Sequence, residues 1–343
     1  MLTSPEARRT LAAFLATASD ATAVEITSAT RLSGGSVQES WRIELAASGG
    51  VLASEPRLVL RADAPTQLAA SRSRVEEFAL LRAAHAAGVR VPEPLFCCTE
   101  PGLLGRPFFL MRWAPGTANG AALARDAAWN GRRDGLVTEL GQQLAHIHGI
   151  APPRPDLGFL GIPPADSAAV RLALYRRWLD GFEDPHPVAE WALRWLLQEK
   201  PAPAGVVLCH GDFRTGNFLV TEDGISAILD WEFAEWGDPH EDIGWLCCKS
   251  WRFGILDREV GGLGDRTMLY RAYESAGGQP VDPLRARYYE VMASLRWLIL
   301  ALQQRERFRR GGERSLDLAL TGRRPSECEF ELLCLIERAE QGE

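Results

Sequence analysis

The stretch Val207–Pro239 reads VLCHGDFRTGNFLVTEDGISAILDWEFAEWGDP, and it decides both the fold class and the chemistry of the chain. It contains residues of the kinds that move protons and hold metal ions: His210, Gly211, Asp212, Asn217 and Asp230. Apolar, strand-like runs at 205–209 and 225–229 precede the two aspartates. A hairpin turn would explain one such polar residue, but it does not explain the whole set at fixed offsets.

This spacing is typical of a phosphoryl-transfer site. Such a site needs a carboxylate that accepts the proton of the substrate hydroxyl, and oxygen ligands that hold Mg²⁺ on the phosphates of ATP. The protein-kinase catalytic loop is spaced H-R-D-L-x-x-x-N, and here the run is H-G-D-F-R-T-G-N. We therefore predict a small-molecule kinase with Asp212 as the general base. Asn217 and Asp230 are the predicted Mg²⁺ ligands.

Two neighbours of the base have expected roles. Arg214 lies two residues after the base. It is a catalytic candidate that either contacts the γ-phosphate or forms a structural ion pair. His210 is expected to support the loop through hydrogen bonds rather than to take part in the chemistry.

The composition is that of an ordinary globular chain. Its 343 residues are enough for two domains or one bilobed domain, and a formal charge of −7 argues against a nucleic-acid partner. Seven cysteines without C-x-x-C spacing favour reduced, mostly buried thiols in a cytoplasmic protein. We find no signal peptide and no run of about eighteen apolar residues, so we expect no membrane partner.

The hydrophobic pattern predicts an α+β fold with two lobes. Helical patterns are expected at 1–20, 75–87, 136–147, 168–198, 264–276 and 282–308. Strand-like runs are expected three times between 27 and 62, and again at 95–98 and 107–112. Together they predict a protein-kinase-like, bilobal fold. Its N-terminal nucleotide-binding lobe (1–113) has a small five-stranded antiparallel sheet plus helix, and a hinge or linker (114–117) precedes a helical C-terminal lobe (118–343) with the catalytic loop and substrate site.

Further candidates for ATP binding come from the N-terminal part. Four of them form a glycine-containing turn whose N–H groups could approach phosphates: Ser33, Gly34, Gly35 and Ser36. Arg61, in the third strand, is the candidate cation for the α- and β-phosphates, and Glu77 is its candidate partner. Glu76 is adjacent and could replace Glu77. Met111 and Trp113, next to the linker, complete the predicted cofactor-binding set.

The residues after Asp230 are candidates for the substrate side. Glu232, Glu235 and Trp236 are predicted to border the substrate. Asp238-Pro239 and Asp242 instead are typical of a turn and a helix N-cap, which is a structural role.

Taken together, these motifs resemble those of the aminoglycoside phosphotransferase/choline kinase-like family, whose hallmark is H-G-D-x-x-x-x-N followed by an L-D-W or I-D motif. The resemblance runs from the glycine turn to about residue 250. The strings HGDFRTGN and LDWEFAEWGDP look closest to the kinase domains associated with acyl-CoA dehydrogenases. In those domains an arginine often stands where other members have lysine, as at Arg61. The resemblance implies a protein-kinase-like fold, ATP and Mg²⁺ as cofactors, and Asp212 as the catalytic base.

The resemblance also bears on the phosphate acceptor, because some members of that subgroup phosphorylate the hydroxyl of a hydroxyacyl-CoA. We therefore expect an O-phosphotransferase for a small-molecule hydroxyl, with a hydroxyacyl-CoA or similar metabolite ranked first. An aminoglycoside or an amino alcohol such as choline is the alternative acceptor. An inactive, nucleotide-binding pseudokinase is the non-enzyme alternative. A protein kinase is disfavoured because Gly237-Asp238-Pro239 follows Asp230 too soon to leave room for an activation segment.

Overall fold

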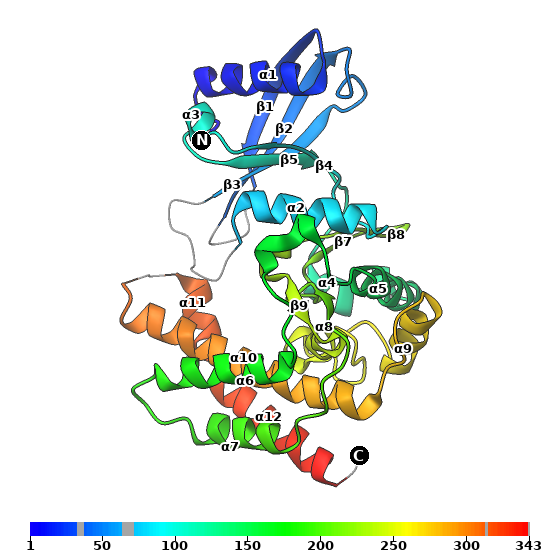
Figure 1. Ribbon diagram of the computed structural model, residues 1–343, viewed down its shortest axis with the longest axis vertical. Helices are drawn as coiled ribbons and strands as arrows, with labels where there is room; N and C mark the ends of the chain where they lie inside the picture. The colour runs from blue at the N-terminus through cyan, green and yellow to red at the C-terminus, as the bar shows by residue number, and fades with distance from the viewer. Residues whose placement is uncertain (33–37, 64–71, 313–314, 342–343) are drawn as a thin grey trace. The chain divides into compact units, whose positions relative to one another are not determined.

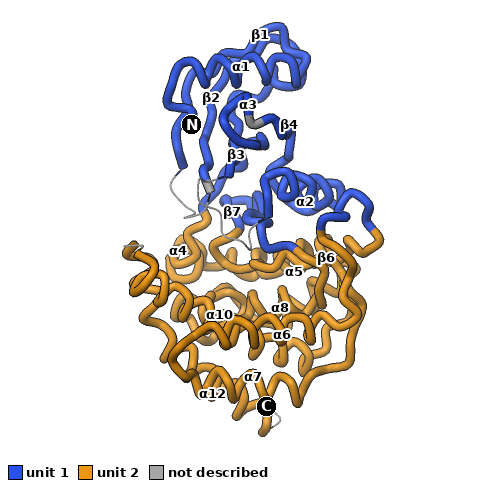
Figure 2. Tube along the Cα trace, turned by 60° about the vertical axis from the view of Figure 1, so that its left-hand side comes forward, with its two compact units in different colours: residues 1–117, 154–159, 218–234 blue, residues 118–153, 160–217, 235–343 orange. Residues whose placement is uncertain are grey.

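The computed structural model describes residues 1–32, 38–63, 72–312 and 315–341, and contacts divide the chain into two units (Figure 2). Unit 1 comprises three segments: 1–117, 154–159 and 218–234. Unit 2 comprises the remainder: 118–153, 160–217 and 235–343. The predicted linker ends where the first segment of unit 1 ends, at Thr117. Unit 1 also takes in two later segments, and the lobe boundaries 1–113, 114–117 and 118–343 stay a prediction.

Unit 1 is built on a five-stranded antiparallel sheet of order β1-β2-β3-β5-β4 (Figure 1). The strands are β1 (Ala23–Arg31), β2 (Gln38–Ser48), β3 (Arg57–Asp63), β4 (Pro94–Cys98) and β5 (Phe108–Arg112). Its helices are α1 (Pro5–Ser19), α2 (Arg74–Ala86) and α3 (Pro101–Leu104). The predicted five-stranded sheet is confirmed, and so is the α+β class.

The two faces of this sheet have different roles, because side chains alternate along a strand. Leu58 and Leu60 of β3 belong to the buried core that includes Leu11 and other residues of α1. The alternate residue Arg61 therefore faces the other side, where α2 packs. Phe78 of α2 lies against Phe109 of β5, with ring centroids 5.9 Å apart. The central strand β3 thus presents Arg61 to α2.

A β-hairpin of unit 1, β7 (Phe218–Thr221) and β8 (Gly224–Ile228), pairs with the linker. Thr117 and Val220 exchange two backbone hydrogen bonds of 3.0 Å each. Gly116 has a φ of 129°, and a Cβ there would lie 2.9 Å from the carbonyl oxygen of Val220. A glycine is therefore required where the linker meets the hairpin.

Unit 2 is mainly helical, as predicted. Its helices are α4 (Gly120–Arg125), α5 (Arg133–His148), α6 (Ser167–Asp180), α7 (Pro187–Gln198), α8 (Pro239–Cys247), α9 (Arg266–Ser275), α10 (Pro283–Arg309), α11 (Leu316–Thr321) and α12 (Pro325–Glu340). Two short strands, β6 (Val207–Cys209) and β9 (Glu235–Gly237), pair with each other. The 3₁₀ segments of the chain are η1 (Ala127–Trp129), η2 (Pro155–Leu160), η3 (Trp231–Phe233) and η4 (Lys249–Trp251).

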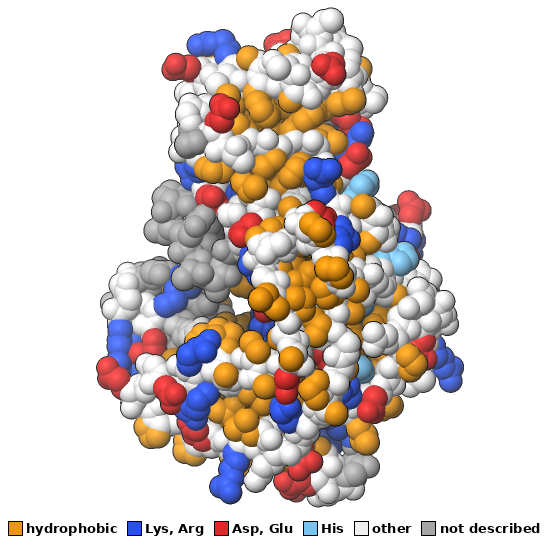
Figure 3. All heavy atoms as spheres, in the orientation of Figure 1, with side chains coloured by type: hydrophobic (Ala, Val, Ile, Leu, Met, Phe, Trp, Pro, Cys, Tyr) orange, Lys and Arg blue, Asp and Glu red, His pale blue; other side chains and the backbone are white. Residues whose placement is uncertain are grey.

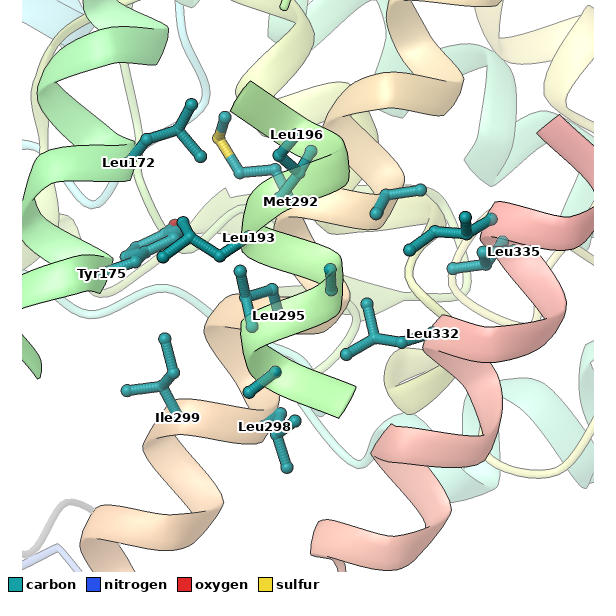
Figure 4. Close-up of a cluster of buried hydrophobic side chains, with 14 of the residues drawn as sticks. Leu172, Tyr175, Leu193, Leu196, Met292, Leu295, Leu298, Ile299, Leu332 and Leu335 are labelled. Carbon is teal, nitrogen blue, oxygen red and sulfur yellow. The ribbon is translucent and has the colours of Figure 1, made fainter. Parts of the chain in front are cut away.

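The helical stretch predicted at 168–198 is wrong in one respect, because it is two helices, α6 and α7. Pro185 lies between them and Pro187 begins α7, and a proline has no N–H to donate to the preceding turn of a helix. Residues from α6, α7, α10 and α12 then enclose one hydrophobic core (Figure 4). Leu295 of α10 lies in this core with Leu193 of α7 and Leu332 of α12.

No helix within the described residues is long and apolar enough to cross a membrane. On the face shown in Figure 3, basic and acidic side chains are interspersed.

Replacing the core residue Leu295 by alanine should lower the free energy of unfolding by about 2–5 kcal/mol, since it leaves a cavity at a fully buried position (0% exposed). Leu284→Ala is the matched control in the same helix, because Leu284 is 72% exposed. Its effect should stay within about 0.5 kcal/mol. Urea unfolding followed by circular dichroism measures both, and equal losses would contradict the burial of this face of α10.

Candidate active site

The predicted catalytic loop follows β6 and belongs to unit 2 as far as Asn217. Gly211 has a φ of 77°, a conformation that favours glycine. His210 is fully buried, and its Nδ1 accepts a hydrogen bond of 3.2 Å from the backbone N–H of Asp212. The expected hydrogen bonding of His210 within the loop is present, while its lack of a chemical role stays a prediction.

Asp242 of α8 holds the backbone of this loop. Its two carboxylate oxygens accept hydrogen bonds from the N–H groups of His210 and Gly211, at 2.7 and 2.9 Å. His148 of α5 lies 3.2 Å from the same carboxylate through Nε2, and its Nδ1 lies 2.9 Å from the hydroxyl of Tyr273. Burial by itself raises the pKa of Asp242, but the hydrogen bonds and charges of His148 and His210 together outweigh it and leave that pKa below its ordinary value.

The expectation that Asp242 helps to cap a helix is wrong. The N-cap of α8 is Asp238, which forms a capping box with Glu241. Asp242 instead lies inside the helix and is buried. Sequence reasoning missed its function, although a carboxylate just before the apolar run Ile243–Cys248 was a sign of a buried partner.

His148, Asp242 and Cys209 offer ligand atoms within 4.8 Å of one another. Each of them already has a hydrogen-bond partner, since the Cys209 thiol lies 3.2 Å from the carbonyl oxygen of Asp238. We therefore interpret the cluster as a buried hydrogen-bond network that supports the catalytic loop.

The structure brings Asp212, Arg214 and Asn217 together. Asn217 Nδ2 donates to Asp212 Oδ2 at 2.6 Å, and Arg214 Nε lies 3.2 Å from Asp212 Oδ1. The Arg214 guanidinium also stacks over the ring of Trp251, 4.4 Å from its centroid. An ion pair between Arg214 and the predicted base is thus present, while a role of Arg214 at the γ-phosphate stays a prediction.

Sequence reasoning did not find Trp245, which also contacts the predicted base. Its indole Nε1 donates to Asp212 Oδ1 at 2.7 Å. The sequence holds eleven tryptophans, most of which must be buried for packing, so nothing in the pattern distinguishes this one.

Unit 1 contains a second set of predicted residues around Arg61. Arg61 Nη1 lies 2.8 Å from Glu77 Oε1, and both side chains are buried. Arg61 Nη2 lies 3.4 Å from Asp230 Oδ1. The partner of Arg61 is thus Glu77, because Glu76 is engaged with Ser73 in the capping box of α2. Burial opposes the charge of Arg61, but the nearby carboxylates raise its pKa, so the guanidinium stays charged.

Asp230 follows β8 at a turn with an unusual backbone. Its φ of 61° lies in the left-handed region, which aspartate tolerates better than most residues. The next residue, Trp231, is fully buried and donates to the carbonyl oxygen of Ile228 at 3.3 Å. The side chain of Asp230 is 45% exposed, and its contact with Arg61 is long. The carboxylate is therefore held only by a long contact and is open enough to accept a further partner.

The remaining predicted site residues have other surroundings. Glu235 of β9 forms an ion pair with Arg171, and Trp236 is buried in the same strand. Met111 is buried in β5, and Trp113 lies under the guanidinium of Arg42, 5.7 Å from the ring centroid. The carbonyl oxygen of Glu232 accepts a hydrogen bond from the N–H of Arg72 at 3.3 Å. Their roles toward substrate or ATP stay predictions, and Ser33, Gly34, Gly35 and Ser36 lie outside the described residues.

Comparison with known proteins identifies relatives over most of the chain. A family model described as the phosphotransferase enzyme family matches residues 28–315. The chain is 29% identical over 247 residues to acyl-CoA dehydrogenase family member 10 of Mus musculus, covering 67% of this chain and 22% of that protein. It is 26% identical over 204 residues to acyl-CoA dehydrogenase family member 11 of Rattus norvegicus, covering 55% of this chain and 24% of that protein. The chain thus spans about a quarter of the length of these curated relatives.

Solved structures show the same fold. A Ralstonia eutropha protein assigned as an aminoglycoside phosphotransferase superposes with a TM-score of 0.77 at 21% identity, covering 97% of this chain and 98% of that chain. A thermostable mutant of aminoglycoside phosphotransferase APH(4)-Ia, in ternary complex with AMP-PNP and hygromycin B, gives a TM-score of 0.62 at 17% identity, covering 97% and 99%. These likenesses confirm the predicted kinase-like fold.

Replacing Asp242 by asparagine should destabilise the protein by about 1–3 kcal/mol. An amide offers only one acceptor oxygen, so one buried N–H of the catalytic loop would face an NH₂ group. Asp265→Asn is the matched control, because Asp265 is the exposed N-cap of α9 and asparagine caps equally well. Urea unfolding of both variants tests this, and an Asp242 variant as stable as the Asp265 variant would contradict the anchoring role.

Proposed function

The chain belongs to the phosphotransferase enzyme family, and on that basis we propose that it transfers the γ-phosphate of ATP, with Mg²⁺, to a hydroxyl of a small molecule. One observation carries the proposal: Asp212, the proposed base, accepts a hydrogen bond of 2.6 Å from Asn217, the proposed metal ligand. An asparagine that both fixes the base and offers its amide oxygen to a metal ion joins the two tasks of the reaction.

In the proposed step, the acceptor oxygen forms a bond to the γ-phosphorus while the bond from that phosphorus to the β,γ-bridging oxygen breaks. Asp212 accepts the proton of the hydroxyl, and the electron pair of the broken bond stays on ADP. Asp212 contributes by holding the acceptor oxygen in line, which is the main task of a protein in phosphoryl transfer. Its hydrogen bonds to Asn217 and Trp245 hold the carboxylate in one orientation.

The donor chemistry of Asn217 and Asp230 fits Mg²⁺. Nδ2 of Asn217 donates to Asp212, so the amide oxygen is the atom left for a cation. The carboxylate of Asp230 is 45% exposed, which leaves room for a ligand beside its long contact with Arg61. Bound Mg²⁺ would neutralise charge on the phosphates.

ATP is the proposed phosphate donor, and its further contacts are assigned to unit 1. We propose that Arg61, held by Glu77, binds the α- and β-phosphates, with Met111, Trp113 and the turn Ser33–Ser36 as further contacts. The buried ion pair of 2.8 Å supports this, because it fixes a permanently charged guanidinium on the central strand. The AMP-PNP complex of a fold relative also supports a nucleotide ligand.

The proposed acceptor is the hydroxyl of a hydroxyacyl-CoA or a similar metabolite. Two observations support it. The curated relatives are acyl-CoA dehydrogenase family members, and the loop carrying Asp212 contains Arg214 and accepts a hydrogen bond from Arg296. Cationic surroundings suit an acceptor with phosphate groups. An aminoglycoside or amino alcohol is the second candidate, favoured by the hygromycin B complex of a fold relative. The substrate-side roles of Glu232, Glu235 and Trp236 belong to the same proposal.

Asp212→Asn should impair turnover, whereas Asp230→Ala should impair the binding of Mg·ATP. Losing the base should lower kcat about 100- to 10,000-fold while Mg·ATP still binds. Losing the carboxylate of Asp230 should instead weaken the binding of Mg·ATP. Steady-state kinetics together with calorimetric titration of Mg·ATP separates the two effects.

The controls are Asp257→Asn and Asp223→Ala, since both side chains are exposed. Each should retain wild-type kcat and Mg·ATP affinity. A near-normal kcat for Asp212→Asn would refute the assignment of the base, and unchanged Mg·ATP binding by Asp230→Ala would refute its role at the metal.

An acceptor screen tests the substrate proposal. ATP consumption should rise above the background with hydroxyacyl-CoA thioesters, because their hydroxyl is the proposed acceptor. Aminoglycosides, macrolides and choline should cause less ATP consumption. Coupled-enzyme detection of ADP measures all of them, with the Asp212→Asn variant as the blank. Turnover confined to an aminoglycoside or choline would favour the second candidate.

A further inference from the structure

We infer that Trp245 is a positioning residue that holds the carboxylate of Asp212 in its working orientation, and this rests on the role proposed for Asp212. The indole Nε1 donates to Asp212 Oδ1 at 2.7 Å. An indole N–H is a donor only and cannot compete for the proton that a base must accept. Trp245 can therefore orient the carboxylate without taking part in proton transfer.

The donors around Asp212 differ in strength. Trp245 bonds to Oδ1 at 2.7 Å and Asn217 bonds to Oδ2 at 2.6 Å, so each oxygen has one short bond. Arg214 Nε lies 3.2 and 3.3 Å from the two oxygens, and its side chain is partly exposed. A carboxylate has about four acceptor positions. An arriving hydroxyl would displace the long contacts of Arg214 before the two short bonds.

Trp245 is itself fixed on several sides. It is buried, and the guanidinium of Arg296 stacks on its ring at 4.3 Å from the centroid. Nη1 of Arg296 donates to the carbonyl oxygen of Gly211 at 2.7 Å. Trp251 and Trp297 pack against the same ring, with centroids 5.2 and 6.4 Å away. Because the ring is packed on these sides, its N–H keeps pointing at Asp212 while the substrate is converted to product.

One helix determines the position of both the backbone and the base. Asp242 and Trp245 lie three residues apart on α8, so they share a face of that helix. Asp242 accepts from the N–H groups of His210 and Gly211, while Trp245 donates to Asp212. The orientation of the carboxylate is thus set by the same rigid element as the loop. The loss of Trp245 would leave Oδ1 of Asp212 without its short hydrogen bond, while Asp242 would still hold the backbone of the loop.

The experiment compares tryptophan-to-phenylalanine changes at two positions of the aromatic cluster. Trp245→Phe removes the indole N–H that bonds to Asp212. Trp297→Phe is the matched control, because its indole nitrogen is buried without a hydrogen-bond partner among the described residues. The reaction is the hydrolysis of Mg·ATP with water as the acceptor, which needs no identified substrate. We expect kcat to fall about 10- to 100-fold for Trp245→Phe, with KM for Mg·ATP unchanged, and no such fall for Trp297→Phe.

A second variant separates the hydrogen bond from the volume of the ring. Benzothienylalanine at position 245 keeps the shape of the side chain and replaces the N–H by sulfur. It should lose as much kcat as Trp245→Phe, and it decides the question if the phenylalanine variant does not fold. In an Asp212→Asn background, Trp245→Phe should lower kcat further by less than about threefold, because Trp245 acts through that carboxylate.

A spectroscopic measurement follows the bond directly. In protein labelled with ¹⁵N-tryptophan, the indole signal of Trp245, assigned by its loss in Trp245→Phe, should move when Asp212 is replaced by alanine. The indole signal of Trp297 should stay in place.

The outcomes separate this inference from the proposed function. Normal kcat in both Trp245 variants, beside an impaired Asp212→Asn, would overturn the inference alone. An equal loss in Trp297→Phe would also overturn it, since packing would then explain the effect. Normal kcat in Asp212→Asn would overturn the role of the base and the inference with it.

Discussion

The hydrogen bonds that Asp242 accepts from two successive N–H groups are the constraint on which the candidate site depends. Both N–H groups belong to buried residues, His210 and Gly211. A buried backbone donor without an acceptor is costly, so loop conformations that break these bonds are rarely populated. The charge of Asp242 is in turn stabilised by His148, which also bonds to Tyr273. The catalytic loop therefore has its shape before any substrate binds.

In unit 1 the predicted residues are held in place by a buried ion pair. There a buried guanidinium, Arg61, is placed by the alternation of the central strand and paired with Glu77 of α2. Such a pair is by itself a weak source of stability. Each member also has a second partner, because Arg61 contacts Asp230 and Glu77 pairs with Arg74. A register shift of one residue in β3 would turn Arg61 to the face covered by α1. The strand register and the ion pair therefore depend on each other.

The sequence predicted the parts of this molecule that depend on local pattern. Alternation predicted the five-stranded sheet. The spacing of Asp212 and Asn217 selected two candidate site residues, and the structure joins them by a hydrogen bond. It could not predict Trp245, since its contact with Asp212 crosses 33 residues and no local pattern records a contact of that kind. The sequence left two adjacent glutamates, Glu76 and Glu77, as candidate partners of Arg61. The capping box of α2 engages Glu76, which leaves Glu77 as the partner. Pro185 and Pro187 mark the division of 168–198 into two helices, which helical periodicity alone does not reveal.

Arginine at position 61 has a consequence for chemical labelling. A nucleotide probe that carries an acyl phosphate can acylate a lysine amine beside the phosphates, because a deprotonated amine attacks the carbonyl carbon and the phosphate leaves. A guanidinium keeps its proton and is a poor nucleophile. The sequence contains two lysines, Lys200 and Lys249, and both are held in ion pairs, with Asp166 and Glu331. If Arg61 binds the phosphates as proposed, a probe of this kind should therefore leave that position unlabelled.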